Sequence, residues 1–333
     1  MGRLTIPNLK TQGLVFLVLT FVVVAVSKVS YGQDAWETVR IESDLVDLKV
    51  SVLGLNPRNP SLLLEKKDFQ IFEDGAPQEI VFFAAADAPF DLVLLLDLSG
   101  SSAKKLKMIK RSAKRFIDEA RPDDRIAIVT FTDRQALLSN FTLNRRQLKQ
   151  EIDGIKDAFG GTNFWDAMNY VLLDLIPQNH ALRRSAIVVM SDGVDNALPD
   201  VPGPGSRITF AELVANIRAS EAIVFPIYVD TESEKDIARY RIPRAAYAQA
   251  REQLGQIASE CGTTLYRASK LSDLDQLYAS VIRDLSTVYS IGYRPLNRSL
   301  DGHWRSVGVQ LIGRPELIAR TRRGYFAKAQ SSP

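Results

Sequence analysis

The chain has 333 residues, of which 46% are hydrophobic and 24% are charged, so it can bury one large core or two moderate ones, and an intrinsically disordered protein is excluded. It carries 42 lysine and arginine residues against 39 aspartate and glutamate residues. Three of the basic residues lie before residue 33, in a stretch without acidic residues, so the two signs balance in the remainder, and nothing global indicates a nucleic-acid ligand or an anionic membrane surface.

The N-terminal segment has the features of an export signal. Arg3 and Lys10 precede an apolar run of about 13 residues, which is short for a membrane span. Ser30 and Gly32 then place small residues three and one positions before a cleavage point. We expect residues 1–32 to be a signal peptide and the body of the protein to reach the periplasm, the cell envelope or the cell exterior. An uncleaved membrane anchor is the alternative interpretation.

Short alternating strands are predicted at both ends of the remaining chain. Residues 33–89 contain "SDLVDLKVSVLG" and "KDFQIFEDGAPQEIVFF", and the second run breaks at "EDGA" as a β-hairpin does. Residues 287–333 contain "HWRSVGVQLIG" and "LIARTRRGYF", which have the same texture. We expect the two segments to form one small antiparallel β unit, with residues 90–286 inserted between them. Two separate β appendages are the alternative.

Residues 90–286 alternate apolar runs of strand length with amphipathic runs of helix length. The runs "FDLVLLLD", "RIAIVTFTD", "RRSAIVVMSDG" and "AIVFPIYVD" read as buried strands. This alternation predicts an α/β fold, a doubly wound and mostly parallel sheet with helices on both faces. Sheets of this kind bind ligands beyond the carboxyl ends of their strands, so the loops that follow the strands are where a site is expected.

The first of these loops lies in "LLLDLSGSSAKK", where Asp97, Ser99 and Ser101 alternate with other residues. One carboxylate and two hydroxyls are suitable ligands for a hard divalent cation. Serine and aspartate are also the preferred helix caps, and a helix is predicted to start here. This motif alone therefore leaves a cation site and an ordinary helix cap as equal alternatives.

Two later motifs favour the cation site. In "FGGTNFWDA" two glycines precede Thr162, which lets the backbone turn and bring the hydroxyl toward the crevice, and in "VVMSDG" a buried strand delivers Asp192. The order D-x-S-x-S, G-G-T and S-D-G resembles the metal-ion-dependent adhesion site (MIDAS) of von Willebrand factor type A (VWA) domains, which have a Rossmann-like fold. All five positions match, and the resemblance covers about 200 residues, from about residue 90 to residue 286.

The resemblance implies a divalent cation, Mg²⁺ first, with Mn²⁺ or Ca²⁺ as alternatives. In the family the two serines and the threonine coordinate the cation directly or nearly so, and the aspartates often act through water. Carried over, this makes ligands of Asp97, Ser99, Ser101, Thr162 and Asp192.

Two further aspartates are candidates for supporting roles. Asp195, in "SDGVDN", is a candidate for orienting waters or the loop, and a surface turn residue is the alternative. Asp133 is a candidate for the rim of the site.

The resemblance also implies a partner, a protein whose acidic side chain completes the metal shell. The terminal segments resemble a bacterial group, known chiefly from acidobacteria, that carries a VWA domain between stretches like "DFQIFEDGAPQEI" and "YSIGYRP". That likeness implies an architecture and export, but no biochemical role.

We therefore predict an exported, cation-dependent protein-binding module, as in cell adhesion, and not an enzyme. A metal-dependent hydrolase is a first alternative, but it lacks an evident base, because the only histidines are His180 and His303 and neither is predicted near the crevice. The only cysteine, Cys261, excludes an intramolecular disulfide and sits late in an apolar helical run. An architectural role in the cell envelope without metal-dependent binding is a second alternative.

Overall fold

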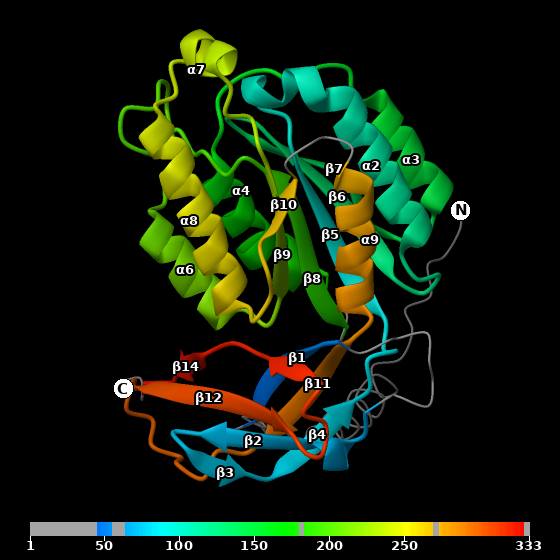
Figure 1. Cartoon of the computed structure of the whole chain (residues 1–333), viewed down its shortest axis with the longest axis vertical. Coiled ribbons are helices and arrows are strands. Elements are labelled where there is room, and N and C mark those ends of the chain that lie inside the picture. The colour runs from blue at the N-terminus through cyan, green and yellow to red at the C-terminus, as the bar shows by residue number, and fades with distance from the viewer. Residues whose placement is uncertain (1–44, 55–63, 180–182, 269–272, 330–333) are drawn as a thin grey trace, which may run out of the picture. The chain divides into compact units, whose positions relative to one another are not determined.

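A six-stranded sheet lies at the centre of the inserted block, in the strand order β10-β9-β8-β5-β6-β7 (Figure 1). Its strands are β5 (Phe90–Asp97), β6 (Arg125–Phe131), β7 (Gln135–Thr142), β8 (Arg184–Ser191), β9 (Ile223–Val229) and β10 (Tyr266–Ala268). All neighbouring pairs are parallel except β6 with β7, which a tight turn joins as an antiparallel hairpin. Strands β5 and β9 are buried along their whole length because helices cover both faces.

Helices lie on the two faces of this sheet in separate groups, α2, α3 and α9 on one side and α4, α6 and α8 on the other (Figure 1). Their bounds are α2 (Leu106–Glu119), α3 (Arg145–Gly154), α4 (Phe164–Tyr170), α6 (Phe210–Ala219), α8 (Arg244–Glu260) and α9 (Leu274–Leu285). Shorter elements are η3 (Gly100–Lys105), η4 (Val171–Leu175, a π-helical turn), α5 (Ile176–Gln178) and α7 (Glu234–Tyr240). The predicted doubly wound α/β fold is confirmed.

Two antiparallel four-stranded sheets form outside this block, in the orders β13-β1-β11-β4 and β14-β12-β2-β3. The strands from the first part of the chain are β1 (Val46–Leu53), β2 (Phe69–Glu73), β3 (Ala76–Gln78) and β4 (Ile80–Ala84), preceded at β2 by η2 (Lys66–Asp68). Those from the last part are β11 (Val288–Tyr293), β12 (Trp304–Leu311), β13 (Ile318–Arg320) and β14 (Gly324–Phe326). Each sheet combines both parts of the chain, so the interpretation as two separate appendages is wrong.

The hairpin predicted at "EDGA" joins β2 to β3. Glu73 pairs with Ala76, and the two residues between them, Asp74 and Gly75, have φ angles of 48° and 81°. A two-residue turn with both φ values positive matches the twist of the strands it joins. The position of the boundaries at residues 89 and 286 stays a prediction.

One buried guanidinium holds both chain connections between the β sheets and the inserted block. Arg184, at the start of β8, donates to the carbonyls of Ala86 and Ala88 on the way in and of Val288 on the way out. Its guanidinium also lies 4.0 Å from the centre of the Phe90 ring. Burial is the main cause that lowers the pKa of Arg184 to about 10, and the positive charge of Arg121 is the second.

The computed structural model describes residues 45–54, 64–179, 183–268 and 273–329. The predicted signal peptide and His180 lie outside these ranges. Among the helices formed by the described residues, none is long and apolar enough to cross a bilayer.

Candidate metal centre

The predicted site residues lie at the carboxyl edge of the central sheet. Asp97 is the last residue of β5, and Asp192 directly follows β8, the parallel neighbour of β5. Because parallel strands end at the same edge, the two loops that follow these strands meet. Both carboxylates are buried, with 1% of each residue exposed.

Asp97 fixes the shape of the first loop. Its Oδ1 accepts a hydrogen bond from the backbone N–H of Ser99 at 2.8 Å, and its Oδ2 accepts one from the Ser191 hydroxyl at 2.5 Å. Ser99 precedes η3, but its side chain makes no capping hydrogen bond. Its hydroxyl lies 3.2 Å from the hydroxyl of Ser101. Ser99 therefore occupies the N-cap position of η3 but does not cap it with its side chain.

Asp192 connects the first loop to the third and to a strand end that the sequence analysis did not consider. Its Oδ2 accepts from the Ser101 hydroxyl at 2.9 Å and from the Thr231 hydroxyl at 2.6 Å. Its Oδ1 accepts from the backbone N–H of Val194 at 3.1 Å. A continuous chain of side chains thus runs from Ser99 through Ser101 and Asp192 to Thr231.

Thr162, on the second loop, is tied to Asn196 of the third loop by two hydrogen bonds. Its carbonyl accepts from Asn196 N–H at 2.8 Å, and its own N–H donates to Asn196 Oδ1 at 3.1 Å. Two residues earlier, the carbonyl of Gly160 accepts from Gly100 N–H at 3.1 Å. A β-carbon on Gly161 would lie 2.6 Å from Asn196 Nδ2, so glycine is required for this close approach. The second loop is therefore tied to the first and to the third.

Asp195 is fully buried, so its interpretation as a surface turn residue is wrong. Its carboxylate accepts from the backbone N–H groups of Trp165, Ala197 and Ser206 and from the Ser206 hydroxyl, at 2.6–3.0 Å. These bonds fasten the loop of residues 195–206 to the start of α4. The carboxylate thus orients the loop, which was one of its two expected roles.

Asp133 lies at the surface, next to the second loop. Its Oδ1 accepts from the Thr132 hydroxyl at 2.8 Å, and its carbonyl accepts from Asn163 Nδ2 at 3.1 Å. A role of Asp133 at the rim of a cation site stays a prediction.

Burial, and after it the negative charge of Asp192, raise the pKa of Asp97 from 3.8 to about 7, against hydrogen bonds from Ser191 and Ser99 that oppose the rise. Burial also raises the pKa of Asp192, against the hydrogen bonds from Thr231, Val194 and Ser101. The charged form of this carboxylate pair is therefore unfavourable at neutral pH unless a positive charge lies beside it. A dication at this place would supply that charge and displace the proton.

The donor set fits a hard divalent cation. Ser101 gives its proton to Asp192 and accepts from the Ser99 hydroxyl, which leaves one lone pair of its oxygen to face a cation. Both oxygens of Asp97 and Oδ1 of Asp192 accept one hydrogen bond each, so each of them keeps a second lone pair for a cation or a cation-bound water, whereas Oδ2 of Asp192 accepts two. In the described parts of the chain, no cluster of three or more His, Cys, Asp or Glu side chains could hold a metal ion. The oxygen set at this edge relies instead on hydroxyls, which suit Mg²⁺, Mn²⁺ or Ca²⁺.

Three residues that shape the site are not among those predicted from the sequence. Thr231 follows β9, and the same strand-end rule would have found it. Ser191 is the residue before Asp192, and its hydroxyl also accepts from Gly193 N–H at 2.8 Å. Tyr240, at the end of α7, donates its hydroxyl proton to the Gly100 carbonyl at 2.6 Å, and no motif in the sequence indicates this contact.

Fold and site together define a doubly wound α/β domain with an oxygen-rich polar cluster at the carboxyl edge of its parallel strands. Residues 92–194 match the family model of the von Willebrand factor type A domain, so the chain carries a domain of this family. The human voltage-dependent calcium channel subunit alpha-2/delta-2 is 27% identical over 132 residues, which cover 36% of this chain and 11% of that protein. The chain thus spans about a tenth of the length of the curated relatives it matches.

Solved structures with a similar fold have low sequence identity. A von Willebrand factor type A protein from Catenulispora acidiphila is 15% identical, with a TM-score of 0.48, over 68% of this chain and 52% of that one. Proximal thread matrix protein 1 from the mussel byssus, solved with a zinc-occupied MIDAS motif, is 18% identical, with a TM-score of 0.47, over 63% of this chain and 48% of that one.

Proposed function

We propose that the chain is an exported binding module that captures a protein ligand through a divalent cation. Ser99, Ser101 and Thr162 would be direct ligands of the cation, and Asp97 and Asp192 would act directly or through water. The observation that carries this proposal is the buried chain of hydroxyls and carboxylates in which Ser101 and Thr231 both donate to Asp192. Mg²⁺ is the favoured cation because the ligands are hard oxygens, with Mn²⁺ and Ca²⁺ as alternatives.

The charge at the site favours an acidic partner. A dication would neutralise the two buried aspartates. At its open coordination position the dication is the nearest charge, so the electric field there would be positive. A carboxylate from the partner would be attracted to that position and would complete the shell. The cation would then form part of the interface, and binding would require it.

Export is proposed from the sequence, namely from the basic residues, the short apolar run and the small residues before residue 33. It would place the site in the periplasm, in the cell envelope or outside the cell.

A catalytic function has less support among the described residues. Burial raises the pKa of the Cys261 thiol to about 12, which disfavours a thiolate nucleophile. His303 lies just before β12, with 76% of its side chain exposed. We therefore propose a non-enzymatic module, and an architectural role without bound cation remains as the second candidate.

Thermal unfolding with and without added Mg²⁺, Mn²⁺ or Ca²⁺ tests the cation site. A cation that binds only the folded protein at 100 times its Kd stabilises it by about 2.7 kcal/mol. Ser101→Ala and Thr162→Val should abolish that rise, whereas Asp174→Asn, which removes an exposed carboxylate on η4, should retain it. No rise with any of the three cations at millimolar concentration would favour the architectural candidate.

Ligand capture is tested separately. Immobilised protein should retain an acidic partner protein from the exported fraction of the source cells in the presence of the cation and release it on chelation. Thr162→Val should retain none. Retention that is unaffected by chelation would contradict a metal-bridged interface.

A further inference from the structure

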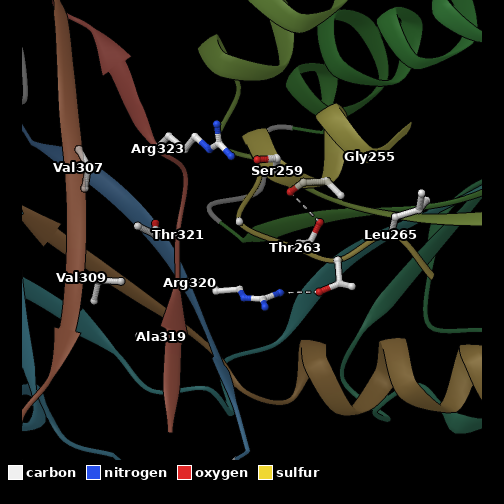
Figure 2. Close-up of a pocket in the computed structure, with 13 residues that line it drawn as sticks. Gly255, Ser259, Thr263, Leu265, Val307, Val309, Ala319, Arg320, Thr321 and Arg323 are labelled. Atoms are coloured by element: carbon white, nitrogen blue, oxygen red, sulfur yellow. Dashed lines mark hydrogen bonds between the residues drawn. The ribbon is translucent and has the colours of Figure 1, made fainter. Parts of the chain in front are cut away.

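A groove with a volume of about 500 Å³ separates the C-terminal part of α8 from the strands β12 and β13 (Figure 2). On one side its wall consists of residues of α8 and of the turn that leads to β10. On the other side it consists of residues of β12, of β13 and of the segment just after β13. None of the candidate cation ligands lines it.

All charged residues that line the groove are positive. Arg320 and Arg323 extend from the β13 segment toward the side of α8 and β10 (Figure 2). Arg320 Nη1 donates to the Thr264 hydroxyl at 2.8 Å, which holds its guanidinium in place. Arg323 is exposed and has no ion-pair partner among the residues that the structure describes. The groove therefore offers two guanidinium groups, one already oriented, to an anionic ligand.

One acidic residue lies near Arg320 without lining the groove. The charge of Arg320 opposes the rise of the pKa of Asp284 that burial causes. The Asp284 carboxylate also accepts a hydrogen bond from the Tyr266 hydroxyl, and the charge of Arg283 acts on it as well as that of Arg320. The positive charge of the groove is therefore only partly compensated.

Two glycines give the groove its depth. Gly262 has a φ of +68°, and a β-carbon on it would lie within 2.7 Å of the backbone of Thr321, so the turn and the β13 segment meet here. Gly255, on α8, faces open space, because a β-carbon on it would meet no atom within 4 Å. On the opposite side of the groove from Gly255, Val307 and Val309 of β12 add apolar surface (Figure 2).

We propose that this groove is a second docking site, which binds an extended acidic segment of a protein partner. Carboxylates of the segment would pair with Arg320 and Arg323, because the guanidinium fork matches the geometry of a carboxylate. Apolar side chains between them would lie against the two valines. This site goes beyond the proposed function and needs no cation.

Fluorescence anisotropy with a labelled ten-residue peptide of alternating glutamate and valine tests the proposal. The protein is first freed of metal over a chelating resin, because soluble chelators are themselves polycarboxylates and would compete. The glutamate peptide should bind at about 0.15 M ionic strength, and the matched glutamine peptide should not. Arg320→Gln and Arg323→Gln should each weaken binding about tenfold or more, whereas Arg298→Gln, which removes an exposed arginine outside the groove, should not.

Gly255→Leu separates groove binding from folding. It fills the open space, keeps both arginines and raises the helix propensity of α8, so the melting temperature should not fall while peptide binding is lost. The proposal would be overturned if the wild-type protein did not bind the peptide. It would also be overturned if Gly255→Leu and both arginine variants bound the peptide as tightly as the wild-type protein does. Binding that requires an added cation and disappears in Asp97→Asn would overturn it too, because the peptide would then occupy the metal centre.

Discussion

Replacing Asp97 with asparagine should remove a pH-dependent loss of stability from the cation-free protein. The wild-type carboxyl is buried beside Asp192, and its pKa rises from 3.8 to about 7. Because the folded state then binds more protons than the unfolded chain, stability is highest at low pH and falls as the pH rises toward 7. Asparagine carries no charge at any pH and keeps the shape of the side chain, so its variant lacks this slope.

The size of the effect follows from the pKa. Between pH 5 and pH 7 the slope is about 1.4 kcal/mol per pH unit, and it levels off above a pKa of about 7. Wild-type protein should therefore lose about 3 kcal/mol relative to Asp97→Asn between pH 5 and pH 8. A change of this size corresponds to a fall in melting temperature of roughly 6–12 °C. Burial raises the pKa of Asp192 too, but Asp192 is present in both proteins, so its contribution cancels in the comparison.

Urea unfolding of both proteins at pH 5 and pH 8, without cation and with millimolar Mg²⁺, measures this difference. Added cation should restore the wild type at pH 8, because it replaces the missing positive charge, and should leave the variant unchanged. Comparing the variant with the wild type at each pH cancels the titration of groups elsewhere in the protein. If the two proteins show the same pH dependence without cation, the electrostatic account of the carboxylate pair is refuted.

Three further substitutions probe the surroundings of the site and the joint. Arg184→Gln should lower the free energy of unfolding by at least about 3 kcal/mol in urea titrations, because it leaves three backbone carbonyls on the two chain connections without their donor. Asp195→Asn should speed hydrogen exchange of the backbone amides in residues 195–206, which lose an anchor at Ser206, and unchanged exchange would contradict that role. Thr231→Val should weaken cation binding about tenfold in calorimetry, because it removes a donor that orients Asp192, and an unchanged Kd would show that this bond is dispensable.

Much of the site could be predicted because one geometric rule generates it. In a parallel sheet the carboxyl ends of neighbouring strands converge, so residues at strand ends come together although they are far apart in sequence. Asp97, Ser101 and Asp192 follow from this rule, and the structure joins Ser101 to Asp192 by a hydrogen bond, while Asp97 binds the backbone of Ser99 in the same loop. Thr231 follows the end of the next strand, so the omission lay in applying the rule to too few strands.

Other features depend on tertiary contacts that leave no local pattern. Val171–Leu175 form a π-helical turn, although nothing in the apolar spacing of this part of the sequence distinguishes it from an ordinary helix. The burial of Asp195 depends on the loop of residues 195–206 folding back over it, which no residue of "SDGVDN" indicates. The groove beside α8 arises where Gly262 meets Thr321, and only the folded chain brings these two together.

The loops of the metal centre are joined to one another by bonds that need no cation. Backbone hydrogen bonds link Gly100 to Gly160 and Thr162 to Asn196, and side-chain bonds link Ser101 and Thr231 to Asp192. A site organised in this way differs from small metal-dependent domains, in which the metal creates the fold. A bound cation would therefore have to order little of these loops. Little of its binding energy would be spent on ordering them, and the affinity would be correspondingly higher. The unfavourable energy of the site lies instead in burying two carboxylates next to each other, and burial accordingly raises the pKa of both Asp97 and Asp192.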